Sequence, residues 1–276
     1  MKLVSIIMTC YNGQKYLDSS LKSLLKQNYK KWELIFLDNN SNDDSKKIFK
    51  KYKDKKMYYF KTKNTLNLGS ARQLAYNKCN GEFITFLDTD DTWSKDKLKL
   101  QIQKFKQNNE IDVLYSKYSI LKNNHIIKRK YKKLVRGFCK EELLLSYIKG
   151  KPLTAWLTLM VKRKVISSLN YAFNKNLHIA SDFDFILRLA DFCNFNYINK
   201  YLASYRIHLK NESNKNKFSE VNELSYIFIK LKHDIIIKQN NYINKFTDRL
   251  FLKKFLFDKI NNKKTNIKNS LIKNNF

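Results

Sequence analysis

Three carboxylates lie within four residues of one another, at Asp88, Asp90 and Asp91, directly after the apolar run of residues 82–87. Like charges at this spacing repel each other, so a cation is needed to offset them. Mg²⁺ and Mn²⁺ bind one or two protein carboxylates and take their remaining ligands from substrate phosphates and water. The segment therefore predicts a divalent-metal site. The structural alternative is an acidic turn that caps the following helix.

Two further segments could hold a ligand beside this site. Residues 9–13 contain a single glycine and no Lys-Ser or Lys-Thr pair, so they form neither a dinucleotide fingerprint nor a P-loop. Tyr11 within them could stack on a nucleotide base or cap a helix. In residues 67–72, Gly69 allows an unusual backbone conformation where a helix begins. Arg72 would lie in the first turn of that helix, as a ligand clamp or a structural ion-pair partner.

Short apolar runs alternate with amphipathic stretches through about the first 110 residues. Runs that are apolar on both faces are typical of strands buried in a parallel sheet, and the stretches between them have helical spacing. In such a sheet, ligands bind beyond the carboxyl ends of the strands, where Thr9, Asp38 and Asp88 lie. The predicted strands are residues 4–9, 32–37, 57–62 and 82–87, and the predicted helices are 16–29, 41–52, 69–79 and one that Ser94 caps.

The pattern is less regular after residue 110. It predicts two strands within residues 111–131, joined by a turn at Asn123 and Asn124. The remaining predicted elements are helices over residues 140–148, 182–192, 218–240 and 242–260, and strands over residues 154–161 and 196–207.

Composition limits the class of protein. Of the 276 residues, 43% are hydrophobic and 14% are aromatic, which excludes a largely disordered chain, and no apolar stretch is long enough to span a membrane. The four cysteines form no CxxC pair, so free buried thiols in a cytoplasmic protein are expected. The net charge of +31 indicates an anionic partner or reflects the residue bias of an AT-rich genome. The run from Lys122 to Lys140 holds eight Lys or Arg and no acid.

Four segments together resemble the successive motifs of family 2 glycosyltransferases with the GT-A fold. They are Val4-Ser-Ile-Ile-Met-Thr-Cys-Tyr-Asn12, Leu37-Asp-Asn-Asn-Ser-Asn-Asp43, Asn67-Leu-Gly-Ser-Ala-Arg72 and Phe86-Leu-Asp-Thr-Asp-Asp91. The resemblance implies an α/β fold with a Rossmann-like, mostly parallel sheet flanked by helices. It implies a GT-A domain over residues 1–210, with a nucleotide-sugar-binding half (1–110) and an acceptor-binding half (111–210). A basic C-terminal helical extension would follow over residues 211–276.

The resemblance also implies roles for individual residues. Asp90 and His208 would ligate a Mn²⁺ or Mg²⁺ cofactor, since Tyr205-Arg-Ile-His208 resembles the segment where some members place a histidine on the metal. Many members have two aspartates where this chain has Asp38 and Asn39, and an Asn oxygen can still accept a hydrogen bond from a uracil N3–H. The residues implied to bind the nucleotide-sugar are Thr9, Tyr11, Asp38, Asn39, Arg72, Asp88 and Thr89.

A further segment, beginning Ser181-Asp-Phe-Asp184, resembles the acidic helix start where the family has its catalytic base. The resemblance selects Asp182 as the base. Asp182 and Asp184 lie about 200° apart on a helix, so both cannot face the site. Many members have Glu where this chain has Ser181. The structural alternative for Asp182 is a helix N-cap.

These roles imply an inverting, non-processive hexosyltransferase of the bacterial surface-polysaccharide type. It would move one sugar from a nucleotide diphosphate, expected to be UDP, to a hydroxyl of a glycan or lipid-linked acceptor. We expect it in the cytoplasm, peripherally on the anionic inner face of the membrane, with a homodimer as a further expectation and no specific nucleic-acid partner.

Two alternatives stay open on sequence alone. One is a sugar-phosphate nucleotidyltransferase, which would need a Gly-rich basic loop that residues 9–15 lack. The other is a non-enzymatic basic protein that binds DNA or RNA with steep salt dependence.

Overall fold

The computed structural model describes residues 1–52, 54–149, 151–211 and 217–230, together with 241, 244–246, 248 and 250. Two compact units divide the chain, Met1–Leu209 and Lys210–Phe276. In the second unit, helix α9 spans Lys217–Lys230, which confirms the first part of the helix predicted over residues 218–240. Residues 231–240 and most of the helix predicted over residues 242–260 lie outside the described residues.

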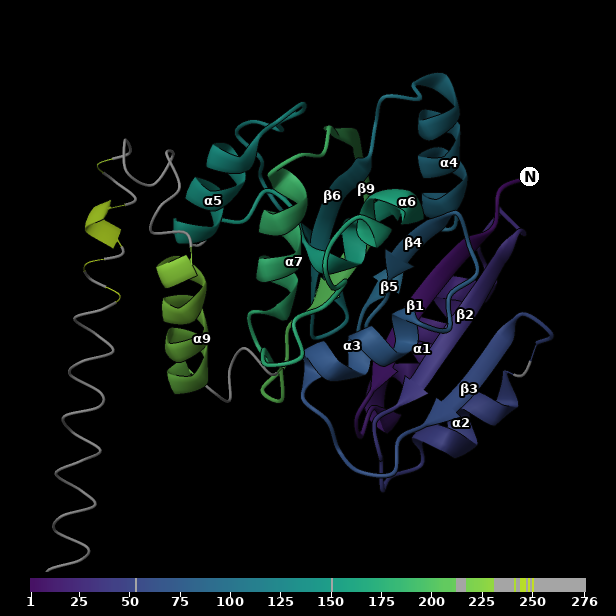
Figure 1. The fold of residues 1–276 in the computed structure, drawn as a ribbon. Coiled ribbons are helices and arrows are strands. Elements are labelled where there is room, and N and C mark those ends of the chain that lie inside the picture. Colours follow the sequence, from purple (N-terminus) through teal and green to yellow (C-terminus); the bar gives the residue numbers. More distant parts are fainter. Residues whose placement is uncertain are drawn as a thin grey trace, which may run out of the picture. The chain divides into compact units, whose positions relative to one another are not determined.

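Four parallel strands form the first part of the sheet (Figure 1). In β1 and β2 nearly every residue is buried, because helices cover both faces of the sheet. The continuous apolar runs in the sequence therefore predicted these strands correctly. In spatial order they are β3 (Met57–Lys61), β2 (Trp32–Asp38), β1 (Val4–Cys10) and β4 (Phe83–Phe86).

Beyond β4 the sheet becomes mixed. β8 runs antiparallel to β4 and to β6, whereas β6 and β9 run parallel to each other. Asn123 and Asn124, with φ of 48° and 63°, form the predicted turn between β6 and β7. The α/β fold class is thus confirmed. The strands of this part are β8 (Met160–Lys162), β6 (Val113–Lys122), β7 (His125–Lys128), β9 (Phe195–Arg206) and β5 (Thr92–Trp93).

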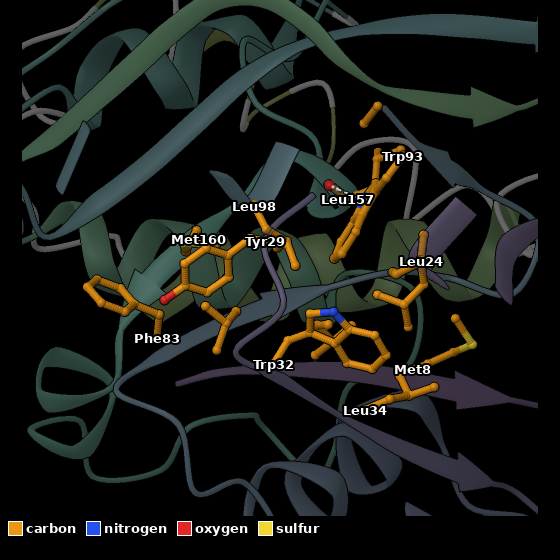
Figure 2. Packing of buried hydrophobic residues seen from close by; sticks show 14 of the residues in the cluster. Met8, Leu24, Tyr29, Trp32, Leu34, Phe83, Trp93, Leu98, Leu157 and Met160 are labelled. Atoms are coloured by element: carbon orange, nitrogen blue, oxygen red, sulfur yellow. Dashed lines mark hydrogen bonds between the residues drawn. The ribbon is translucent and has the colours of Figure 1, made fainter. Parts of the chain in front are cut away.

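Helices pack on both faces of the sheet. On one face they meet Met8 and Leu34 (Figure 2), and on the other they meet Ile7 and Ile35. Successive strand residues point to opposite faces, so each strand contributes to both hydrophobic cores. The first face carries α1 (Gln14–Leu25), α2 (Ser45–Lys51) and α4 (Lys97–Gln107). The second carries α3 (Leu68–Tyr76), α5 (Lys140–Ile148), α6 (Arg163–Ser167) and α7 (Ser181–Ala190).

The strand predicted over residues 154–161 is wrong in its first half. The structure has a 3₁₀ turn there, η1 (Trp156–Thr158), and only then the short strand β8. Buried side chains from other elements satisfy three successive carbonyls of this segment, so it needs no strand partner. The pairs are Trp93 Nε1 with Leu157 O at 2.9 Å, Gln101 Nε2 with Thr158 O at 2.9 Å, and Thr85 Oγ1 with Leu159 O at 2.5 Å.

Two predictions about helix starts also need correction. α4 begins at Lys97 with Asp96 in the capping position, so Ser94 does not cap it. Gly69 is part of α3 and does not have a positive φ, so it supplies no unusual backbone conformation. It is needed for space instead, because a Cβ at this position would lie 2.0 Å from the Asn174 carbonyl oxygen.

None of the described helices is both long and apolar enough to cross a membrane. The four cysteines are free and buried, as expected from the sequence. Burial raises the pKa of each thiol above its ordinary value, which keeps the thiols unreactive.

Candidate active site

The loops that follow β1 and β2 are held together at one edge of the sheet. Asn12 has a left-handed backbone (φ 52°), and its N–H donates to Ser41 Oγ at 3.0 Å. Gly13 allows a close approach to the turn after β4, because a Cβ would lie 3.0 Å from Thr89 Oγ1. Thr9, one residue before the end of β1, is half-buried, and Tyr11 just beyond the strand is 54% exposed, as a base-stacking residue would have to be.

Asp38 and Asn39 are buried at the end of β2, and their side chains already have partners. The Asp38 carboxylate accepts from Ser41 N at 2.7 Å and from the Tyr59 hydroxyl. Burial, and next this carboxylate, raise the pKa of Tyr59. The Asn39 amide donates to Leu66 O at 2.8 Å and accepts from Leu66 N at 2.9 Å. The Asn39 oxygen, which the sequence offered to a uracil N3–H, is therefore already engaged with the loop after β3.

Helix α3 begins against the loop that precedes α7. Gly69 N donates to Leu177 O at 2.9 Å, and Leu68 N donates to His178 Nδ1 at 3.0 Å. The Asn67 side chain caps the helix by accepting from Ser70 N at 2.8 Å. These contacts fix the helix start, and with it the position of Arg72 one turn later.

Arg72 is a buried cation with unused donors. Only 4% of the residue is exposed, and its guanidinium carbon lies 4.1 Å from the centroid of the Trp156 ring. Among the described residues, Arg72 Nε and Nη1 have no hydrogen-bond partner. Burial lowers the pKa of Arg72, whereas the charges of Asp88 and Asp182 raise it. A buried guanidinium in this state is suited to bind an anion.

The acidic turn after β4 is anchored from β9. Arg206 donates through Nε to Asp90 O at 2.7 Å and through its backbone N to Asp91 Oδ1 at 2.8 Å. Burial raises the pKa of Asp91 well above its ordinary value. Burial also raises the pKa of Asp88 to about 7, with Arg72 opposing this shift and the neighbouring carboxylates adding to it. Asp91 is thus held in the framework by Arg206, and the Asp88–Asp91 turn gathers carboxyl groups beside Arg72.

Asp90 and His208 form the candidate metal site. Asp90 Oδ2 and His208 Nε2 lie 2.9 Å apart, and the His208 ring packs against Tyr16 with 4.7 Å between ring centroids. The described residues contain no group of three or more protein side chains arranged to ligate a metal. One carboxylate and one imidazole fit Mn²⁺, and less closely Mg²⁺, when phosphate oxygens and water supply the other ligands. The donor set therefore fits a metal that is bound together with a diphosphate.

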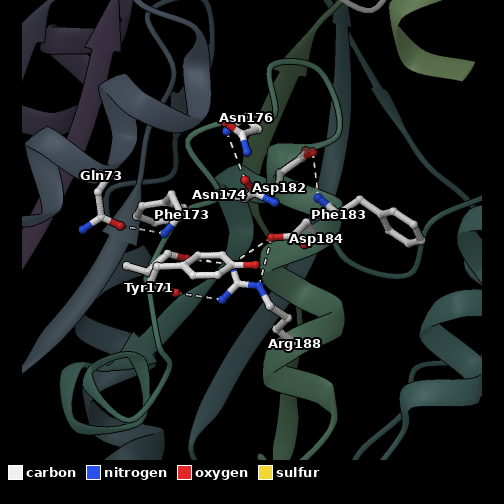
Figure 3. A network of polar contacts seen from close by, with 10 residues as sticks. Gln73, Tyr171, Phe173, Asn174, Asn176, Asp182, Phe183, Asp184 and Arg188 are labelled. Atoms are coloured by element: carbon white, nitrogen blue, oxygen red, sulfur yellow. Dashed lines mark hydrogen bonds and ion pairs between the residues drawn. The ribbon is translucent and has the colours of Figure 1, made fainter. Parts of the chain in front are cut away.

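The predicted base, Asp182, lies in the first turn of α7 (Figure 3). Ala180 occupies the capping position and no side chain caps the helix, so the N-cap alternative for Asp182 is wrong. Asp184 is turned toward Arg188 and pairs with it at 2.9 Å. Asp182 is close enough to Arg72 and Asp88 for its charge to raise the pKa of both. The structure thus places Asp182 beside the site and Asp184 in the framework that supports α7.

Sequence reasoning missed three residues of this region: Tyr16, Tyr59 and Arg206. Arg206 lies only two residues before His208, in a segment that the resemblance had already singled out. Its partners Asp90 and Asp91, however, lie 116 and 115 positions earlier in the chain. No local pattern reports a contact over that distance, so only the spacing to His208 could have drawn attention to it.

Ligand-binding groups gathered beyond the carboxyl ends of parallel strands define the class of α/β nucleotide-binding enzymes. Comparison with known protein families identifies the family within this class. The chain belongs to glycosyl transferase family 2, whose model matches residues 5–168, more than half of the sequence. It is a glycosyltransferase, as the motifs implied. The nucleotidyltransferase and the non-enzymatic nucleic-acid-binding protein are thereby set aside.

Three known proteins illustrate the relationship. The Escherichia coli UDP-Glc:alpha-D-GlcNAc-diphosphoundecaprenol beta-1,3-glucosyltransferase WfaP is 29% identical over 244 residues, which cover 86% of this chain and 91% of WfaP. The crystal structure of S. aureus TarS 1–349 in complex with UDP-GlcNAc superimposes with a TM-score of 0.66 at 19% identity, covering 93% of this chain and 73% of that one. The Pyrobaculum calidifontis mannosyltransferase PcManGT, in complex with GDP-Man and Mn²⁺, superimposes with a TM-score of 0.62 at 15% identity, covering 92% and 69%.

Proposed function

We propose that this enzyme transfers a single hexose from a UDP-linked donor to a hydroxyl of a lipid-linked sugar diphosphate, with inversion at the anomeric carbon. One observation carries the proposal: buried Arg72 has two nitrogens without a partner among the described residues, and it lies beside the acidic turn. Unpaired buried donors are costly, so a ligand that pairs them is expected. The diphosphate of a nucleotide-sugar has the charge and the oxygens to do so.

The donor would be held from both ends. The exposed Tyr11 ring offers a stacking face for the base, with Thr9, Asp38 and Asn39 shaping the wall behind it. Asp88 and Thr89, in the turn after β4, would contact the ribose and the sugar. Asp90 and His208 would hold Mn²⁺ or Mg²⁺, which when bound stabilises the negative charge that develops on the leaving diphosphate. Arg72 adds a fixed positive charge for the same purpose.

Asp182 would accept the proton of the acceptor hydroxyl. A hydroxyl is a poor nucleophile near neutral pH, and a carboxylate positioned against it raises its reactivity as the bond to the anomeric carbon forms. A single base that acts on the face opposite the leaving group implies inversion, so an α-linked donor gives a β-linked product. Asp184 is occupied by Arg188 and is not a second candidate for this role.

The acceptor class is proposed from WfaP, one of the relatives that the chain matches over most of its length. WfaP, as its name states, transfers glucose from UDP-Glc to alpha-D-GlcNAc-diphosphoundecaprenol through a beta-1,3 linkage. A β-linked product from a UDP-linked donor is the outcome that the single-base geometry also requires. We therefore propose a polyprenyl-diphosphate-linked sugar as the acceptor for this chain.

Titration calorimetry with UDP and GDP, with and without Mn²⁺, tests the donor site. We expect UDP to bind the wild-type protein more tightly in the presence of Mn²⁺, and we expect Asp90→Asn to abolish this metal dependence. Lys22→Ala, at an exposed ion pair with Asp18, is a matched surface control and should bind UDP like the wild type. Failure of folded wild-type protein to bind either nucleotide would overturn the proposal.

Asp182→Asn separates binding from chemistry. The variant should keep the affinity for UDP but lose transfer activity by roughly a thousandfold, as expected when a general base is removed. Transfer would be measured from UDP-glucose and UDP-GlcNAc to a short-chain GlcNAc-diphospholipid, with the anomeric configuration read by NMR. An α-linked product, or full activity of Asp182→Asn, would contradict the proposed mechanism.

A further inference from the structure

The hairpin of β6 and β7 carries exposed isoleucines on an edge strand. All four residues of β7 are exposed, with Ile126 at 66% and Ile127 at 55%. Successive residues of a strand point to opposite faces, so neither face of β7 is covered. In the part of the chain that the structure describes, β7 pairs only with β6. Adjacent exposed isoleucines on an open strand edge favour aggregation unless another surface covers them.

Two more exposed aliphatic side chains lie at the same end of the sheet. Leu121 of β6 is paired with Ile126 on one side and with Arg206 on the other, and its carbonyl accepts from Ile207 N at 2.9 Å. Ile207 is 40% exposed, and Leu209 is 94% exposed. We call the set of Ile126, Ile127, Ile207 and Leu209 the hairpin surface.

The charge around the hairpin surface selects its partner. Residues 113–140 contain no acid, and exposed lysines flank β7 on both sides. A second copy of the chain would bring the same cations against each other, so pairing of two β7 edges is disfavoured. An anionic bilayer satisfies both features, because its headgroups attract the lysines and its acyl boundary takes up the isoleucines. The exposed lysines are Lys122, Lys128, Lys130, Lys132 and Lys133.

We propose that the hairpin surface docks this enzyme on an anionic lipid bilayer, with Ile126 and Ile127 inserted at the boundary between headgroups and acyl chains. His208 lies in the chain between Ile207 and Leu209, so docking brings the candidate metal site to the plane of the headgroups. This deepens the proposed function, on which it rests for its purpose: a polyprenyl-linked acceptor presents its sugar diphosphate in that same plane. The docking itself is testable without donor or acceptor.

Tryptophan probes distinguish insertion from adsorption by net charge. The three native tryptophans are buried, at 2%, 6% and 5% exposure, so they are shielded from quenchers in a bilayer. Ile127→Trp places a probe in the hairpin surface. Phe138→Trp is the matched control, because Phe138 is 75% exposed within the same basic run but beside the start of β9 rather than its end. Vesicles of phosphatidylcholine and phosphatidylglycerol with brominated acyl chains would be the quencher.

Strong quenching of Ile127→Trp with little quenching of Phe138→Trp is the expected result. Equal quenching of the two probes, or quenching of neither, would overturn the proposal. A second variant, Ile126→Ser with Ile127→Ser, should reduce partitioning into the same vesicles roughly 30-fold, because two apolar side chains are no longer buried. Vesicles of phosphatidylcholine alone should bind the wild type weakly, since the lysines then have no anionic partner.

Failure of docking and failure of the proposed function are distinguishable. The Ser variant should transfer sugar to a short-chain acceptor in solution as fast as the wild type, yet act more slowly on an acceptor embedded in vesicles. The Ser variant could instead bind vesicles as tightly as the wild type, while sedimentation shows that the wild type self-associates through β7. That outcome would overturn the proposal and identify a second copy of the chain as the partner of the hairpin surface. If the wild type does not act on the soluble acceptor, the proposed transferase function is contradicted and not the docking.

Discussion

Two of the buried cationic side chains in the first unit, Lys97 and Arg72, each lie 4.1 Å from the centroid of a tryptophan ring, and they differ in their hydrogen bonding. Lys97 at the start of α4 is fully buried over Trp93, and its Nζ donates to Thr85 Oγ1 at 3.0 Å and to Gln101 Oε1 at 2.8 Å. Arg72 over Trp156 has two nitrogens without a partner in the described part of the chain. Lys97 is satisfied by the protein, and Arg72 is the side chain that we propose to pair with a ligand.

Lys97 helps to position the segment that contacts Arg72. Lys97 fixes Thr85 and Gln101, and these donate to the carbonyls of Leu159 and Thr158 at the end of the 3₁₀ turn. That turn begins at Trp156, on which Arg72 lies. Burial alone therefore does not mark a functional residue. A charged donor without a partner is more informative, because it lowers the stability of the protein until a ligand pairs with it.

Arg72→Met gives the largest expected effect and tests the comparison most directly. The affinity for UDP should fall roughly a thousandfold, because about two charge-assisted hydrogen bonds are lost. The free energy of unfolding should stay unchanged or rise, since the variant removes a buried charge with unpaired donors. Calorimetry and urea unfolding would measure the two quantities. A clear loss of stability would mean that Arg72 is a structural cation like Lys97.

Gly69→Ala should be the next largest change. The new Cβ would lie 2.0 Å from the Asn174 carbonyl, so α3 must move away from the loop before α7. We expect the free energy of unfolding to fall by roughly 3 kcal/mol, more than the gain of about 1 kcal/mol in helix propensity. UDP binding should weaken as well, because Arg72 moves with α3. Ala75→Gly, further along the same helix, is the control that changes propensity without a steric clash.

Gln101→Leu tests the satisfied cation. The change leaves Lys97 with Thr85 alone and the Thr158 carbonyl without its 2.9 Å donor. We expect a loss of roughly 2 kcal/mol in the free energy of unfolding, with the affinity for UDP little changed. Chemical unfolding and calorimetry on the same sample would compare the two. A loss of UDP binding free energy larger than the loss of unfolding free energy would contradict the distinction between Lys97 and Arg72.

The smallest expected effect is a pH slope. Burial lowers the pKa of Lys97 well below its ordinary value of 10.5, so the unfolded chain holds a proton that the folded chain has released between these two values. Stability from this residue therefore rises with pH through that window and stops rising near 10.5. Lys97→Met should therefore show a flatter increase in unfolding free energy than the wild type as the pH rises toward 10.5. An identical slope in both proteins would contradict this.

The sequence predicted the parallel half of the sheet well because β1, β2 and β4 are short, mostly apolar segments that are buried on both faces. It missed β5, since Thr92–Trp93 is too short to show a period. It misread residues 154–161 because three side chains, from β4, β5 and α4, replace strand neighbours there. Hydrogen bonds from side chains in place of strand partners depend on tertiary contacts, so they leave no local pattern in the sequence.

The candidate site was predictable where residues cluster in sequence, as at Asp88 and Asp90. Resemblance alone supplied Asp182 and His208. The sequence analysis did not identify Lys97, because the burial of a single lysine cannot be inferred from helical spacing. The engagement of Asn39 with Leu66 also lay beyond sequence, since it joins the ends of two neighbouring strands through a loop.

The pairing of Asp90 with His208 also bears on how the protein is made. During translation the Asp88–Asp91 turn leaves the ribosome early, and His208 is added 118 residues later. Arg206, which anchors the turn, is added just before it. A growing chain thus carries the acidic turn through most of its synthesis without the imidazole and guanidinium that complete it. The proposed metal site can therefore form only after the last strand of the first unit has been synthesised.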